Sequence, residues 1–275
     1  MISRRALILS GAGLFITKSA LSKSDERSYV LGSTLLEDIV SDLTAGRAKT
    51  RLLISGSACP GHTDVKASDL VFAANAQGIY VHPRQMTLPS LTQLFAAKEQ
   101  LRTRTHGIGV SGSWLIPDVQ IQASRAVAKT LVQGETSDFS DAVYARLQKR
   151  IERIKDFSEG LEPVRTRFHG KPVVSALMQK DFVSWCGFSI AATFGGAESM
   201  NPKILAEIIA LARKRRVIGV VENLQSGKEA GLPIAEELKI PRAILSNFPG
   251  SDDNVPDYFS LVRENIRQLL LLTGN

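Results

Sequence analysis

The residues of this chain that could do chemistry begin with Cys59 and His62, which lie on a turn that also contains Pro60 and Gly61. The apolar run 51–55 precedes this turn and is typical of a buried strand. Open α/β folds place ligand-binding groups on turns that follow the carboxyl ends of such strands. A thiol and an imidazole at such a turn are the groups of a metal site, of a site for an organic ligand, or of a thiol enzyme.

Local spacing favours neither catalysis nor a preformed metal cluster. Three residues on a turn do not fix a geometry between Cys59 and a base, and no serine lies in a GxSxG elbow. Residues 107–112 match GxGxxG, but no buried strand precedes them and Pro117 follows too soon for a helix, so we reject a dinucleotide site. The histidines form no HxxxH or HExxH pair: His62, His82, His106 and His169. We expect no enzyme, and any metal site must combine distant segments.

Composition indicates a folded chain with room for two lobes. Of its 275 residues, 44% are hydrophobic and 22% are charged. The formal net charge of +7 is scattered, apart from the run 213–216 at a predicted helix end, where cations suit the helix dipole. No aromatic residues accompany this run, so we do not expect nucleic-acid binding. Cys59 and Cys186 are too few for a disulfide framework, and separate thiols are favoured over a bridge between them.

The N-terminus resembles an export signal. Ser3-Arg4-Arg5-Ala6-Leu7-Ile8 resembles the twin-arginine pattern, and the apolar segment 6–16 is too short to span a bilayer. Ala20 and Ser22 are small residues that suit cleavage after residue 22. We therefore expect a twin-arginine-like signal peptide over residues 1–22 and a periplasmic protein, with an uncleaved anchor as the weaker alternative.

The rest of the chain alternates between strand and helix patterns. Strands are predicted within 29–33, 51–55, 78–81, 108–116, 172–175, 188–194, 217–222 and 242–246. Helices are predicted between them, among them one amphipathic helix over 91–101. One helix, 138–161, has a continuous apolar stripe and a length of roughly 35 Å. The pattern predicts an α/β fold with two lobes, each a parallel-type sheet flanked by helices, joined by one long rigid backbone helix. The expected division is an N-terminal lobe over 23–137, the linking helix 138–161 and a C-terminal lobe over 162–275.

Three stretches resemble the cluster A-I substrate-binding proteins of ABC transporters, which carry zinc, manganese or iron to a membrane permease. Residues 60–69 resemble the family's D-P-H-x-Y-x-P-(S/T)-x-x-D stretch, and Ser113-Trp-Leu-Ile-Pro117 resembles the end of H-x-W-(L/M)-(D/S)-P. Residues 187–246 resemble the second lobe, with Pro202-Lys-Ile-Leu-Ala-Glu-Ile-Ile, Val220-Val-Glu-Asn and Ile234-Ala-Glu-Glu-Leu. The resemblance implies two α/β lobes joined by a rigid helix, and a solute-binding protein that serves an ABC permease in the inner membrane.

The resemblance also implies where a metal would bind. The family uses four residues, two from each lobe, which are mostly histidines together with a carboxylate. His62 matches the first of these, whereas Gly112, Ala176 and Ser246 occupy the other three positions. Glycine and alanine offer no side-chain ligand, and one imidazole does not complete a tetrahedral site. A divalent metal is therefore possible, but not in the family's usual site.

Polar and soft side chains near strand ends are expected to line the cleft between the lobes: Cys59, His62, His82, Arg84, Trp114, Met178, Gln179, Glu222, Asn223, Ser246 and Asn247. Glu222 is expected to bind the ligand or to pair with Arg84, with another polar partner as the alternative. Packing in the core is the alternative for Trp114 and Met178. The expected ligand is a metal, a metal complex or a small organic molecule.

A second function stays open for the same scaffold. A periplasmic accessory protein that has lost metal binding would act by contact with a partner protein, such as an exported redox enzyme. The twin-arginine-like signal fits this alternative, because ordinary carriers need not fold before export.

Overall fold

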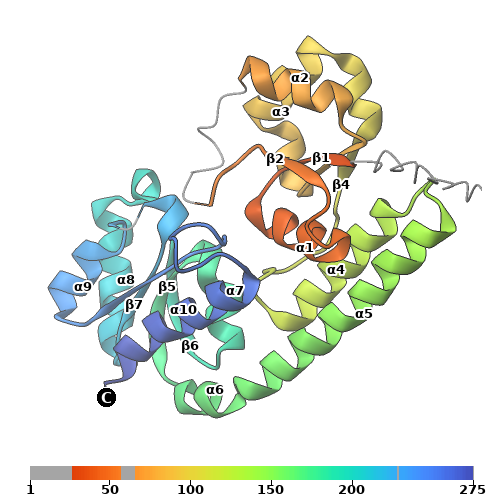
Figure 1. The fold of residues 1–275 in the computed structure, drawn as a ribbon. Coiled ribbons are helices and arrows are strands. Elements are labelled where there is room, and N and C mark those ends of the chain that lie inside the picture. Colours follow the sequence, from red (N-terminus) through yellow and green to blue (C-terminus); the bar gives the residue numbers. More distant parts are fainter. Residues whose placement is uncertain (1–26, 57–65, 228, 275) are drawn as a thin grey trace, which may run out of the picture.

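The computed structural model describes residues 27–56, 66–227 and 229–274, and it contains two lobes that are each built on a parallel sheet (Figure 1). The first sheet has the order β2-β1-β3-β4, formed by β1 (Ser28–Leu31), β2 (Lys49–Leu52), β3 (Gly78–Val81) and β4 (Thr105–Gly107). The second has the order β6-β5-β7-β8, formed by β5 (Pro172–Ala176), β6 (Ser189–Phe194), β7 (Val220–Asn223) and β8 (Arg242–Leu245). The expected fold class is confirmed.

Helices flank both sheets. The first lobe contains α1 (Thr34–Thr44), α2 (Ala67–Asn75), η2 (Pro83–Thr87), α3 (Pro89–Ala97), η3 (Glu99–Arg104) and α4 (Pro117–Leu131). The second contains α6 (Glu162–Phe168), η4 (Leu177–Gln179), α7 (Lys180–Trp185), η5 (Ala197–Ser199), α8 (Pro202–Arg215), η6 (Leu224–Ser226), α9 (Leu232–Leu238), α10 (Tyr258–Leu270) and η7 (Leu271–Thr273). In the part of the chain that the structure describes, no helix has the length and apolar character needed to cross a bilayer.

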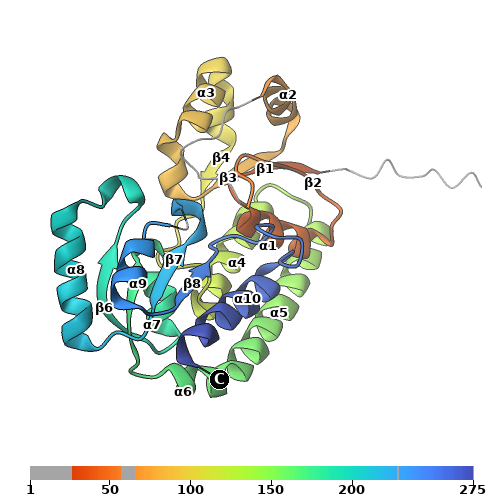
Figure 2. The same ribbon diagram turned by 90° about the vertical axis from the view of Figure 1, so that its left-hand side faces the viewer.

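The long helix α5 (Ser137–Gly160) connects the lobes and packs against α1 and α4 (Figures 1 and 2). Thr136 caps its first turn by accepting the N–H of Phe139, and its buried face belongs to the same apolar core as α1. Near the other end, the ring of Phe157 lies 5.3 Å from that of Phe259 on α10. Both lobes therefore share one core along this helix, which makes the connection stiff.

Two local expectations were wrong. No strand forms in 108–116, and the edge strand β4 lies earlier, at Thr105–Gly107. The chain turns after this strand, because Val110 donates its N–H to the carbonyl of Ile108 and Gly112 has a φ of +98°. The single helix expected over 91–101 is divided into α3 and η3 by Lys98, whose backbone is extended.

Candidate functional site

The carboxyl edges of the two sheets meet between the lobes. Gln225, which follows β7, donates its Nε2 to the carbonyl oxygen of Gly56, which follows β2, at 2.9 Å. Thr34, which follows β1, donates its Oγ1 to the carbonyl of Pro249, beyond β8, at 2.7 Å. A Cβ atom at Gly56 would lie 2.2 Å from the Pro249 oxygen, so only glycine permits this approach.

Uncharged amide and hydroxyl side chains fill the carboxyl edge of the second sheet. We call this set the amide network: Gln179, Asn223, Gln225, Ser246 and Asn247. Asn223 Oδ1 accepts from Gln179 Nε2 at 2.9 Å and from Asn247 Nδ2 at 2.7 Å. Gln225 accepts the backbone N–H of Asn247 at 3.0 Å and donates to Ser246 Oγ at 2.9 Å. The ends of three neighbouring strands are thus joined by neutral hydrogen bonds.

Burial makes this network costly to leave incomplete. Gln179 is fully buried and Asn223 is 2% exposed, yet Gln179 Oε1 has no hydrogen-bond partner among the described residues. A buried acceptor without a donor costs about 1–3 kcal/mol. Gln179 Oε1 is therefore the acceptor of this network that the described residues leave without a donor.

The three family positions of the metal site carry no metal ligand here. Ala176 is buried at the end of β5, and the Ser246 hydroxyl is occupied by the N–H and carbonyl of Phe248 as well as by Gln225. A Cβ at Gly112, in its left-handed conformation, would lie 3.2 Å from Val119, so a histidine there would be strained. No group of three or more His, Cys, Asp or Glu side chains that could hold a metal occurs among the described residues.

His82 and Trp114 lie together at the first lobe's carboxyl edge. Their ring centroids are 4.2 Å apart, and His82 Nε2 lies 2.8 Å from the hydroxyl of Ser33, the N-cap of α1. Burial lowers the pKa of His82 to about 4, so the imidazole is neutral at pH 7. The indole N–H of Trp114 donates to the carbonyl of Val110 at 3.2 Å, and its side chain is buried. Trp114 therefore packs in the core, which was the alternative to a place in the cleft lining.

Glu222 has the polar partner that its alternative prediction gave it, and that partner is Arg242 and not Arg84. Its carboxylate is fully buried, binds Arg242 Nη1 on the neighbouring strand β8 at 2.5 Å, and accepts the N–H of Gly231 at 3.1 Å. A Cβ at Gly231 would touch both Glu222 and Phe194, so this side chain lies on the sheet face that the segment leading into α9 covers. Successive strand residues point to opposite faces, which separates Glu222 from Asn223.

The remaining predicted residues are dispersed. Met178 is 52% exposed on η4, beside the equally exposed Leu177, so a core position for Met178 is wrong. Arg84 lies exposed on η2, and Cys59 and His62 lie outside the described residues. Cys186 is a buried free thiol whose pKa is raised by that burial, which leaves it unreactive.

Sequence reasoning missed Gln225, the member of the amide network that bonds to the other lobe among the residues that the structure describes. The signal that points to it is weak. Polar amides stand at position 223, the last residue of a buried strand, and at position 225 just beyond it, where α/β folds place binding groups. The crossing to Gly56 spans 169 residues of sequence and leaves no local pattern.

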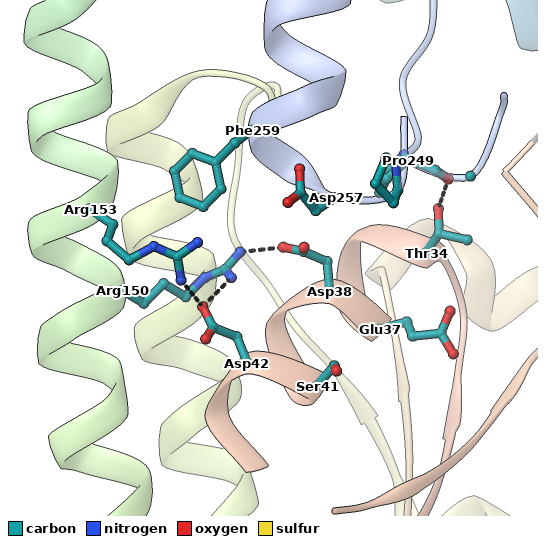
Figure 3. A pocket seen from close by; sticks show the side chains of 12 residues that line it. Thr34, Glu37, Asp38, Ser41, Asp42, Arg150, Arg153, Pro249, Asp257 and Phe259 are labelled. Carbon is teal, nitrogen blue, oxygen red and sulfur yellow. Dashed lines mark hydrogen bonds and ion pairs between the residues drawn. The ribbon is translucent and has the colours of Figure 1, made fainter. Parts of the chain in front are cut away.

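A second contact between the lobes lies on α1, α5 and α10 and is strongly charged (Figure 3). Arg150 on α5 is 1% exposed and binds Asp38 at 2.5 Å and Asp42 at 2.8 Å, both on α1. Asp38 also accepts the backbone N–H of Tyr258 on α10, and Tyr258 donates its hydroxyl to the carbonyl of Leu115. Arg150, Asp38 and Asp42 line a pocket of about 470 Å³ together with residues of the loop before α10.

Comparison with known proteins places this arrangement in a fold family. No family model matches the chain, and no curated protein matches it. Among solved structures, ZnuA has a TM-score of 0.75 at 13% identity, and the similarity covers 91% of this chain and 100% of that chain. The periplasmic zinc binding protein TroA from Treponema pallidum has a TM-score of 0.73 at 14% identity, and the similarity covers 91% of this chain and 100% of TroA. A periplasmic metal binding protein from Candidatus Liberibacter asiaticus has a TM-score of 0.72 at 14% identity, covering 90% and 100%. The chain therefore has the fold of these periplasmic metal-binding proteins, which confirms the fold that its resemblance to the cluster A-I proteins implied.

Proposed function

We propose that this chain is an extracytoplasmic solute-binding protein that delivers a ligand to an ABC permease and catalyses no reaction. The shared fold with proteins described as periplasmic zinc or metal binding supports this role. The signal-like segment 1–22, outside the described residues, supports a periplasmic location reached by the twin-arginine route. We also propose the division into lobes 23–137 and 162–275 with 138–161 as their link.

The ligand is an uncharged hydrogen-bonding molecule or a metal complex, in place of a bare ion held in the family manner. The amide network supports this proposal, because it occupies the strand ends where the family's metal ligands would stand. Zinc and transition-metal sites are built from imidazole, thiolate and carboxylate groups, and a neutral amide edge does not compensate a buried dication. Gln179 Oε1 is suited to accept a hydrogen bond from such a ligand.

A thermal-shift panel on the EDTA-treated full chain tests this function. It would contain Zn, Mn, Fe, Cu, Ni and Co ions, then metal chelates and small polar organic compounds. A ligand at 100 times its Kd adds about 2.7 kcal/mol to the stability of the folded state. We expect no rise in Tm with bare ions and a rise with a chelate or an organic compound. That rise should disappear in Gln179→Met and persist in the matched control Gln148→Met, an exposed site on α5. A rise that occurs only with a bare ion would contradict the proposal.

A second candidate is the partner-binding protein on the same scaffold. It is supported by the hydrogen bond from Gln225 to Gly56, which joins the lobes directly, and by the exposed pair Leu177 and Met178. This candidate predicts that no compound in the panel raises Tm. A compound that stabilises the wild type but not Gln179→Met would exclude it.

A further inference from the structure

Seven basic residues of the second lobe lie at the edge opposite to the amide network, in segments that lead into the strands. All strands of this sheet are parallel, so the segments that lead into them lie at one edge. Backbone hydrogen bonds join these segments directly, from Gly170 to Gly187 at 2.9 Å, from Ile218 to Pro172 at 2.9 Å and from Val220 to Pro241 at 3.0 Å. Cations that are separate in the sequence therefore become neighbours on one surface.

We call this surface the basic edge: Arg167, Lys171, Arg213, Lys214, Arg215, Arg216 and Lys239. All of these residues are exposed except Lys171, which is partly buried. Two carboxylates, Glu236 and Glu237, lie in the last turn of α9 beside them, and Arg213 binds Glu237. The surface keeps a clear excess of positive charge, which attracts polyanions.

The helix dipole alone does not explain the cations at this edge. Arg216 adopts the left-handed conformation with a φ of +53° and caps α8, so this exposed cation lies just beyond the helix. The dipole interaction is confined to the last helical turn and needs no cation from neighbouring elements. Arg167 nevertheless joins from α6, and it binds the carbonyl of Gly274 in the C-terminal turn at 2.6 Å.

Exposed leucines accompany these cations. Leu211, two residues before the run, is 46% exposed, and Leu271 in η7 is 54% exposed. Leu272 packs against Gly219, which follows the basic run, so η7 lies at the same edge. Figure 1 shows the C-terminus at the end of this lobe that points away from α2 and α3. A row of cations with protruding leucines is the composition that binds at an anionic bilayer interface.

We propose that the basic edge binds an anionic lipid surface. Lysine and arginine attract the headgroups, and Leu211 and Leu271 can enter the interfacial layer. Nucleic acid is the less favoured polyanion, because no exposed aromatic side chain accompanies the cations among the described residues of this edge. The proposal does not depend on the cleft, since the amide network lies at the opposite edge of the sheet. It would hold the carrier beside a membrane whether or not a ligand is bound.

Vesicle binding of the full chain tests this inference. Sedimentation would compare vesicles of phosphatidylcholine alone with vesicles that contain about one third phosphatidylglycerol, at about 0.1 M and about 0.5 M salt. We expect binding only to the anionic vesicles at low salt. Lys214→Gln combined with Arg215→Gln should weaken binding about 25-fold, because each cation near an anionic surface contributes about fivefold. The matched pair Arg146→Gln and Lys149→Gln, exposed on α5, should change binding about twofold or less.

Hydrogen exchange gives a local readout that residues 1–22, common to all variants, cannot supply. Anionic vesicles should protect the segments 211–217 and 271–274 and leave α5 unchanged. Equal binding to neutral vesicles, equal loss in both variant pairs, or protection confined to other segments would overturn the proposal. A stronger affinity for a DNA or RNA oligomer than for anionic vesicles, lost in the same Lys214 and Arg215 variant, would assign the edge to nucleic acid instead.

Discussion

The two contacts between the lobes differ in chemistry. At the meeting of the sheet edges, Gln225 and the amide network use neutral hydrogen bonds. On the α5 side, a buried arginine holds two aspartates and, through Asp38, the start of α10. A neutral hydrogen bond contributes about 0.5–1.5 kcal/mol net, whereas breaking a buried ion pair costs about 3–5 kcal/mol. The comparison indicates that the charged contact contributes more to holding the lobes together than the neutral contact does.

The largest effect should come from Arg150→Met. This change leaves Asp38 and Asp42 without their main partner at an inter-lobe contact, and we expect a loss of about 3 kcal/mol in the free energy of unfolding. Denaturant titration measures it. The control is Arg153→Met, because Arg153 is 56% exposed and its bond to Asp42 should contribute less than about 1 kcal/mol. Equal losses in the free energy of unfolding for Arg150→Met and Arg153→Met would contradict the claim that the buried arginine makes the charged contact strong.

A smaller effect is expected at the neutral contact from Gly56→Ala. The new methyl group would meet the carbonyl of Pro249 and the backbone of Gly250, which must move apart. Overpacking of this kind costs about 1–3 kcal/mol. Gly109→Ala is the matched control, since a Cβ there meets nothing within 4 Å. If Gly56→Ala lowered the free energy of unfolding more than Arg150→Met does, the neutral contact would be the stronger of the two.

A smaller effect still is the loss of folding stability that His82, in the first lobe, causes at mildly acid pH. Burial lowers the pKa of His82 from 6.5 to about 4, so below pH 6.5 the unfolded chain binds a proton that the folded protein excludes. Stability from this group is complete above pH 6.5 and is lost as the pH falls towards 4, with about 1 kcal/mol lost near pH 5.5. His82→Phe should flatten this dependence in denaturant titrations.

His106 is the comparison for that experiment. Its pKa is also lowered by burial, so it contributes to acid sensitivity in the same direction. Because its ring is less enclosed, His106→Phe should leave most of the pH dependence in place. If His106→Phe removed more of the dependence than His82→Phe, the assignment to His82 would be wrong.

The fold was predictable because strands and helices alternate with clear local patterns. The strand Gly78–Val81 forms where the sequence predicts it, and α5 begins and ends one residue from the expected bounds. The site was only partly predictable. Gln179, Ser246 and Asn247 follow apolar strands and lie at the expected edge, but the partner of each depends on which strands are neighbours.

The missed features join distant parts of the chain. Arg150 lies within a helix with an apolar stripe, and its aspartates are more than 100 residues away. The pairing of Glu222 with Arg242 depends on the parallel register of β7 and β8, which local sequence does not specify. Such contacts are set by topology, so periodicity and motif spacing do not reveal them.

Direct titration of zinc tests the central claim that the cleft does not hold a bare ion in the family manner. The EDTA-treated full chain would compete with a chromophoric chelator for Zn²⁺, and Cys59→Ala combined with His62→Ala would serve as the matched variant. We predict that the wild type and the variant release equal, small amounts of zinc from the chelator. Uptake of one zinc ion per chain by the wild type, lost in the variant, would show a metal site rebuilt around the 59–62 turn and would contradict the account.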